Sequence, residues 1–88
     1  MIFISLSRFK KKPTKDMIAQ VVKLHEQMTE EGAKVVSIYW TLGRYDTVSI
    51  IEGKDEKTAM KSLLRYTDML STETLVAVPA EEARKLVE

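Results

Sequence analysis

The sequence predicts an α+β fold in which two helices cover one face of a four-stranded antiparallel sheet. Strand-like and helix-like hydrophobic patterns follow each other in the order strand, helix, strand, strand, helix, strand. Only a short turn separates the two central strands, which favours an antiparallel hairpin. With 88 residues the chain is too short for two independent cores, so we expect one domain over residues 1–88.

The first strand is expected over residues 2–7, because apolar side chains there occur at every second position. A basic loop over residues 8–13 follows, and Thr14 is a suitable N-cap for the first helix. Apolar residues then recur with helical spacing as far as Met28. Gly32 lies where a helix C-terminus favours glycine, so the helix is expected to end there.

Two further strands are expected at residues 35–41 and 47–52, which are rich in β-branched and aromatic side chains. Asp55 is positioned to cap a second helix, and a last strand is expected over residues 72–78. Pro79 favours the start of a short C-terminal helix.

The register of the central hairpin depends on its turn. A two-residue turn at Gly43-Arg44 suits type II′ geometry, which favours glycine at the first position. A three-residue tip would instead align the aliphatic residues of both strands on one face, and each Val or Ile turned to water forfeits about 1.5–3 kcal/mol. We therefore expect the three-residue tip. Its pairs are Ile38 with Ile50 and Trp40 with Val48.

This order of elements favours the ferredoxin-like βαββαβ arrangement with strand order 4-1-3-2, followed by the short C-terminal helix. One face of the sheet then stays uncovered, and we expect the chain to form a two-fold homodimer through it, while the unpaired edge strands 2 and 4 allow association into larger rings. The residues expected on this face are Phe3, Ser5, Ser7, Ser37, Tyr39, Thr41, Ser49 and Ile51. Those expected to form the oligomer contact are Phe3, Ser37, Tyr39 and Ile51.

Composition argues against several classes of partner. The net charge of +1 gives no general attraction to nucleic acid or to anionic membranes. No apolar run approaches the roughly 20 residues that cross a bilayer, and the charges follow the apolar N-terminal segment instead of preceding it as in a signal peptide. The absence of cysteine fits a reducing compartment, and we expect a cytoplasmic protein.

The run from Trp40 to Asp46 carries an indole, a guanidinium, a phenol and a carboxylate around one glycine. Short turns seldom carry so many large functional side chains. Two interpretations stay open. Tyr45 and Asp46 could hold the hairpin to neighbouring strands, or Trp40, Arg44, Tyr45 and Asp46 could contact a ligand or partner, since Trp, Tyr and Arg dominate binding hot spots.

The remaining candidates favour neither metal nor RNA. His25 is the only histidine and the chain has no cysteine, so we expect no metal site and no cofactor. The basic loop Arg8–Lys12 could meet phosphate, and the first strand is similar to a sheet motif of RNA-recognition domains. Residues 47–51 lack the aromatic side chains of the companion motif, however, so we expect no specific nucleic-acid partner.

At Tyr39–Asp46, followed by Thr72–Leu75, the chain resembles the GYD-domain family of small prokaryotic proteins. That family is named after the Gly, Tyr and Asp that match Gly43, Tyr45 and Asp46. The resemblance covers nearly the whole chain in length and element order. It implies a ferredoxin-like fold that assembles as in the dimeric α+β barrel group, and it assigns no activity.

We therefore expect a homo-oligomeric module that binds a small molecule or a protein partner without chemistry of its own. The alternative is a cofactor-free or haem-handling enzyme of the dimeric α+β barrel type. Such an enzyme would use Trp40, Tyr39 and His25 near the cleft between helices and sheet or in the barrel interior. RNA binding on the open sheet face is a third alternative.

Overall fold

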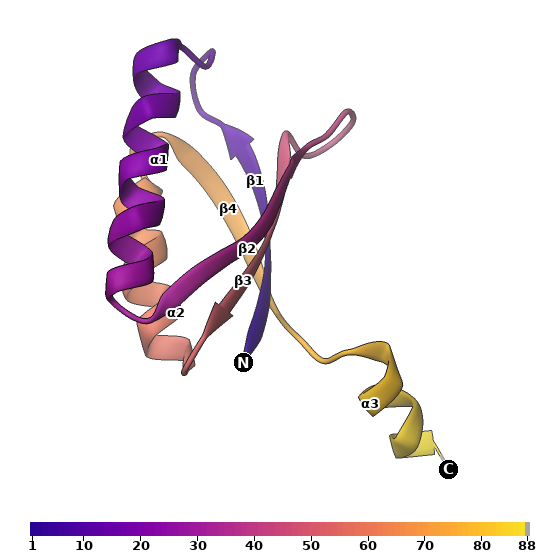
Figure 1. Cartoon of the computed structure of the whole chain (residues 1–88). Helices are drawn as coiled ribbons and strands as arrows, with labels where there is room; N and C mark the ends of the chain where they lie inside the picture. Colours follow the sequence, from indigo (N-terminus) through magenta and orange to yellow (C-terminus); the bar gives the residue numbers. More distant parts are fainter. Residues whose placement is uncertain (88) are drawn as a thin grey trace.

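A computed structural model describes residues 1–87 and has the predicted order of elements (Figure 1). The strands are antiparallel in the order β2-β3-β1-β4, which is the predicted ferredoxin-like topology. The main elements are β1 (Ile2–Phe9), α1 (Lys15–Glu30), β2 (Ala33–Trp40), β3 (Thr47–Gly53), α2 (Glu56–Leu63), β4 (Leu70–Ala77) and α3 (Ala80–Arg84). Two 3-10 turns, η1 (Leu64–Tyr66) and η2 (Lys85–Val87), follow α2 and α3.

Both long helices begin at the caps that the sequence predicted. The Thr14 hydroxyl accepts a hydrogen bond from the Met17 N–H at 3.2 Å, and the Asp55 carboxylate accepts one from the Thr58 N–H at 2.8 Å. The latter bond lowers the pKa of the Asp55 carboxyl. Gly32 follows α1 with a φ of 98°, a conformation that favours glycine.

Helices α1 and α2 lie side by side on one face of the sheet (Figure 1). The core between these two layers is small, and one of its polar groups is satisfied internally, since the Tyr66 hydroxyl donates to the Met28 sulfur at 3.0 Å. The buried hydrophobic residues are Phe3, Met28, Ala33, Ile51, Ala59 and Tyr66.

The side chains of β1 and β3 face the opposite sides of the sheet from those that the sequence predicted. Phe3 and Ile51, which were expected on the uncovered face, are only 3% and 2% exposed and lie beneath the helices. The predicted oligomer contact is therefore wrong for these two residues. Ser37 and Tyr39 do lie on the uncovered face, opposite Ile50 and Val48 of β3. The hydroxyl residues Ser5, Ser7 and Ser49 are also buried on the helix side instead of lying on the open face.

The hairpin register accounts for the exchange of faces along β3. Ile38 pairs with Ser49 and Trp40 with Thr47, which is the register of the two-residue turn, so the predicted three-residue tip is wrong. Gly43 has a φ of 105°, the positive value that a turn with glycine first requires. A shift of one residue moves every side chain of a strand to the other face, and β1 follows β3 through its own pairing.

The uncovered face of the sheet is consequently more apolar than the sequence predicted. We call this surface the open face; its apolar members are Ile4, Leu6, Tyr39, Val48, Ile50 and Leu75. They lie in two rows across the four strands, Tyr39–Val48–Leu6–Glu73 and Ser37–Ile50–Ile4–Leu75. The four central residues, Ile4, Leu6, Val48 and Ile50, are half-buried by neighbouring side chains of the same domain, whereas Tyr39 at one end is 60% exposed.

The chain ends in a projecting arm. Residues 78–87, which we call the C-terminal arm, leave the end of β4 and extend away from both the sheet and the helices (Figure 1). Its last apolar side chains, Leu86 and Val87, are 82% and 87% exposed. Within residues 1–87 no helix has the length and apolar character needed to cross a membrane.

Candidate functional site

Asp46 fixes the hairpin tip to the end of β1. Its carboxylate accepts a hydrogen bond from the Phe9 N–H at 2.8 Å, and its own N–H donates to the Ser7 carbonyl at 2.8 Å. On the other side of the turn, the Thr41 N–H donates to the Asp46 carbonyl at 2.8 Å. The contacts of Asp46 are thus those of a residue that joins β1 to the β2–β3 turn.

Tyr45 connects the same tip to β4. Its hydroxyl donates to the Glu73 carboxylate at 2.6 Å, and this bond raises the pKa of the Tyr45 phenol. The Tyr45 carbonyl accepts from the Thr41 hydroxyl at 2.6 Å, and the Arg44 guanidinium lies 5.7 Å from the centre of the Tyr45 ring. One half of the tip is therefore held by β1 and β4, which follow β3 in the order of the sheet.

The other half of the tip is open to solvent. The Trp40 ring rests at a tilt on Phe9, with 5.2 Å between ring centres, but remains largely exposed. Leu42 is completely exposed. Sequence reasoning passed over this leucine, although an aliphatic residue beside Gly43 in a short turn was a visible signal. Trp40, Leu42 and Arg44 are thus the tip residues that a partner could reach.

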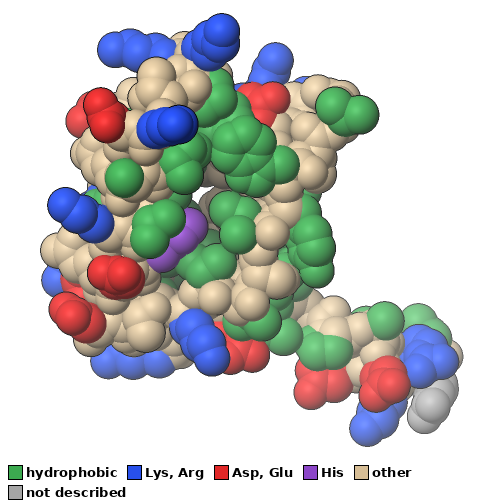
Figure 2. Space-filling view, turned by 45° about the horizontal axis from the view of Figure 1, so that its top comes forward, with side chains coloured by type: hydrophobic (Ala, Val, Ile, Leu, Met, Phe, Trp, Pro, Cys, Tyr) green, Lys and Arg blue, Asp and Glu red, His purple; other side chains and the backbone are tan. Residues whose placement is uncertain are grey.

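A chamber lies below Trp40, between the helices and the sheet. Its volume is about 50 Å³, which is enough for one or two water molecules, since one water occupies about 30 Å³ in the liquid. Figure 2 shows the surface hollowed beside the single histidine, with apolar side chains around the hollow. The polar and aromatic residues that line the chamber are Ser5, Ser7, Phe9, His25, Trp40, Thr47, Ser49, Tyr66 and Thr72.

Five hydroxyl residues lie on the sheet wall of the chamber, beside six aliphatic or aromatic residues. The Ser5 hydroxyl pairs with that of Thr74 at 3.2 Å, but the side-chain hydrogen bonds within residues 1–87 include none to the hydroxyls of Ser7, Thr47 or Ser49. The one buried side-chain oxygen without a hydrogen-bond partner among the described residues is that of Ser62 in α2, so the hydroxyls of Ser7, Thr47 and Ser49 are not fully enclosed. These three groups are consequently available to a polar guest. Sequence reasoning missed them because it placed the serines on the other face.

His25 and Tyr66 form part of the opposite wall, with 5.8 Å between ring centres. Burial lowers the pKa of His25 and raises that of Tyr66, so both side chains are neutral at pH 7. No carboxylate of the described residues lines the chamber. Across residues 1–87, no three His, Asp or Glu side chains gather in a way that could hold a metal ion.

A family model described as GYD domain matches residues 2–87, nearly the whole chain. The chain belongs to the GYD-domain family. Among solved structures, this GYD domain is similar to the protein TTHA0845 from Thermus thermophilus, with 25% identity, a TM-score of 0.55, and coverage of 90% of this chain and 94% of that one. It also matches a dimeric ferredoxin-like protein of unknown function from Thermobifida fusca, with 19% identity, a TM-score of 0.48, and coverage of 86% and 89%. A search of curated proteins gave no significant match.

In this GYD domain the residues that match the family name take up one turn and its anchors. Gly43 supplies the positive φ, Tyr45 reaches β4, and Asp46 reaches β1. All three residues thus have contacts or backbone angles that stabilise the hairpin.

Proposed function

We propose that this GYD domain is a homo-oligomeric binding module without chemistry of its own. In this proposal it self-associates through the open face and holds a small polar molecule in the chamber. One observation carries both parts: the two central strands turn the aliphatic Ile4, Leu6, Val48 and Ile50 outward and the hydroxyl residues Ser5, Ser7, Thr47 and Ser49 inward. A lone domain gains stability from the reverse arrangement, so the outward aliphatic residues favour a second apolar layer.

The open face has the properties that a sheet-on-sheet contact requires. Ile4, Leu6, Val48 and Ile50 form a central apolar patch, with Tyr39 and Leu75 at its ends. Two such faces pack about 10 Å apart. A stable contact buries on the order of 1,200–2,000 Å². Because the same patch serves both copies, the simplest product is a two-fold dimer.

Sedimentation velocity at low micromolar concentration tests this assembly. The wild type should sediment as a dimer, twice the chain mass of 10.1 kDa. Tyr39→Asp should shift the population to monomer, because the aspartate would lose its hydration in the contact. The substitution should leave the fold intact, because Tyr39 is exposed in the single domain. Val22→Asp, an aliphatic-to-acidic change at an exposed site on α1, is the matched control and should leave the dimer unchanged. A monomeric wild type, or a Tyr39→Asp dimer of unchanged affinity, would contradict the assignment of the face.

The chamber supports binding of a molecule with few non-hydrogen atoms and several hydrogen-bonding groups. The hydroxyls of Ser7, Thr47 and Ser49 offer donors and acceptors from the sheet, and the neutral His25 lies across from them. A buried polar guest of this kind gains hydrogen bonds that water otherwise supplies.

Native mass spectrometry of freshly purified protein, together with an NMR screen of small polar compounds, tests the binding site. The expected result is a retained or added small molecule whose shifts map to the chamber. The double variant Ser7→Ala and Ser49→Ala should weaken that binding at least roughly tenfold, since two hydrogen bonds are lost. The control Ser71→Ala, at an exposed position of β4, should not change it. Equal binding by both variants would refute the chamber as the site.

The arrangement favours binding over the enzymatic alternative. His25 and Trp40 line the chamber, but Tyr39 lies on the open face, so the three residues considered for catalysis do not converge in the cleft. Among the described residues, His25 also lacks a carboxylate within the chamber that could orient it as a general base.

A further inference from the structure

A second hollow lies on the helix side of β4, outside the chamber. It is a groove of about 390 Å³ between α2 and β4, a size within the usual range for binding pockets. Met60 and Leu64 project from one wall and Val76 from the other, and all three are about 60% exposed. Phe3 and Ala59 are buried at its floor. The groove is therefore an apolar surface without a cover.

The C-terminal arm projects from the body and carries a matching apolar stripe. Ala80, Ala83 and Val87 recur at helical spacing, and Leu86 adjoins them. Leu86 and Val87 gain nothing from burial where the arm now lies, since both are more than 80% exposed. The arm thus has apolar side chains without a partner, and the groove has the complementary surface.

The geometry of the connection directs the arm away from its own groove. Pro79 has φ and ψ of −53° and 140°, and a proline also restricts the preceding residue, Val78, to extended conformations. Two extended residues continue the path of β4 outward, on the side of the sheet away from α1 and α2 (Figure 1). Folding back onto its own α2 would require this junction to leave the extended region.

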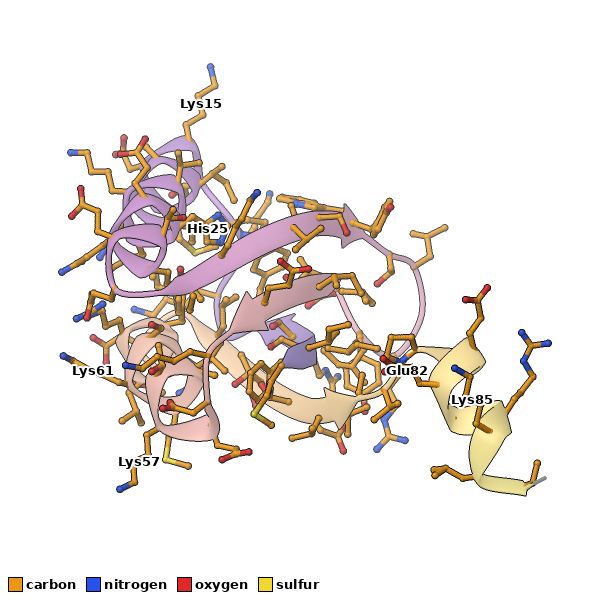
Figure 3. The ribbon with its side chains drawn as sticks, turned by 60° about the horizontal axis from the view of Figure 1, so that its bottom comes forward. Lys15, His25, Lys57, Lys61, Glu82 and Lys85 are labelled. Carbon is orange, nitrogen blue, oxygen red and sulfur yellow. The ribbon has the colours of Figure 1, made fainter. Side chains whose placement is uncertain are left out.

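The charges of the arm and of α2 are complementary when the two run antiparallel. The arm is acidic at its start, with Glu81 and Glu82, and basic in its last turns, with Arg84 and Lys85. Helix α2 has Glu56 and Lys57 in its first turn and Lys61 in its last turn, so antiparallel docking brings the acidic start of the arm to Lys61 and its basic end to Glu56, which lines the groove. Figure 3 shows Lys57 and Lys61 pointing into solvent at one side of the molecule, and Glu82 and Lys85 on the arm at the other side. These charges cannot meet within one chain as it stands.

We propose that the C-terminal arm of one copy docks in the α2–β4 groove of a second copy, antiparallel to α2. Leu86 and Val87 enter the apolar groove, and Glu81 and Glu82 approach Lys61 in the last turn of α2. In a two-fold dimer each copy gives an arm and receives one, so both grooves are filled. The inference rests on the self-association proposed above, but not on which face of the sheet makes the main contact.

Disulfide trapping tests this docking directly, because the chain has no cysteine of its own. A disulfide forms only when the two Cα atoms come within about 4.4–6.8 Å. Chains carrying Met60→Cys are mixed with chains carrying Leu86→Cys under mild oxidation, and linked peptides are identified by mass. A mixture of Lys23→Cys and Leu86→Cys is the matched control, since Lys23 is an exposed residue of α1.

We expect the Met60–Leu86 link between chains to form at least tenfold faster than the Lys23–Leu86 link. Equal rates would overturn the docking. A single chain carrying both Met60→Cys and Leu86→Cys that closes on itself at nanomolar concentration would also overturn it, by placing the arm in its own groove. Sedimentation separates this failure from that of the proposed function. A dimer without the preferred link refutes only the arm, whereas a monomeric wild type refutes the self-association on which it rests.

Discussion

Replacing Asp46 with alanine should destabilise the fold measurably. The substitution removes the carboxylate that accepts the Phe9 N–H at 2.8 Å and leaves that N–H, in a partly buried position, without a protein partner. Hydrogen bonds to charged groups contribute roughly 1.5–3 kcal/mol, and partial access of water to this site reduces the expected loss to about 1–2 kcal/mol. For a chain of this length, 1 kcal/mol corresponds to about 4–8 °C in melting temperature. Asp46→Ala should therefore melt about 4–16 °C below the wild type.

Differential scanning calorimetry is the appropriate assay, with sedimentation to record the assembly state in parallel. Asp46→Asn keeps an acceptor oxygen and should lose less stability than Asp46→Ala. Asp68→Ala changes the same residue type at an exposed site and should melt close to the wild type. If Asp46→Ala melts with the wild type and assembles normally, Asp46 does not hold the tip, and the interpretation as a contact for a ligand or partner takes its place.

Three further predictions concern charge. Glu31 accepts two hydrogen bonds from the Arg65 guanidinium and lies 3.5 Å from the Lys61 ammonium, so Glu31→Gln should lower the melting temperature at low salt. This loss should shrink in 1 M salt, because the screening length falls to about 3 Å. A loss of melting temperature that does not depend on salt would contradict the prediction. Burial lowers the pKa of His25 below its ordinary 6.5, so the folded state binds that proton less tightly than the unfolded state does. The stability that neutral His25 contributes is therefore present above pH 6.5 and is lost as the pH falls below that value. Urea denaturation between pH 7 and pH 5.5 should show this decline, and His25→Gln should flatten it. Finally, the protein should not bind single-stranded RNA sequence-selectively at physiological salt. Its net charge is +1, and among the described residues of the open face Tyr39 is the only aromatic one. Selective binding at micromolar concentration in a filter assay would refute this prediction.

The order of elements and the starts of α1 and α2 followed from local signals, whereas β2 and β4 begin two residues earlier than expected. Thr14 and Asp55 are preferred caps and form the predicted bonds, and glycine at position 32 takes the predicted conformation. Such signals act within four residues along the chain and need no knowledge of the tertiary structure. The topology then followed from the order of strands and helices.

The faces of the sheet could not be predicted in the same way. Alternation along β1 shows that Ile4 and Ser5 lie on different faces, but not which face the helices cover. The prediction assumed that aliphatic residues face the helices, and it counted Val48 and Ile50 on the other face as lost to water. That energy argument outweighed the turn preference of Gly43, which the structure follows. The hydroxyl-lined chamber was missed for the same reason, since it exists only in the register that was rejected.

The irregularity in β2 bears on how far assembly can proceed. The pairing of β2 with β3 shifts between Val35 and Ser37, so Val36 is an extra residue that interrupts the regular ladder. β2 is also an outermost strand of the sheet, where an uninterrupted row of free N–H and C=O groups would serve as a template for strand addition. The bulge bends and twists that row, so an incoming strand would lose its pairing after three residues on one side. Strand addition at the β2 edge is thereby disfavoured, and β4, whose pairing with β1 is regular over eight residues, is the edge where an added strand would find an uninterrupted row.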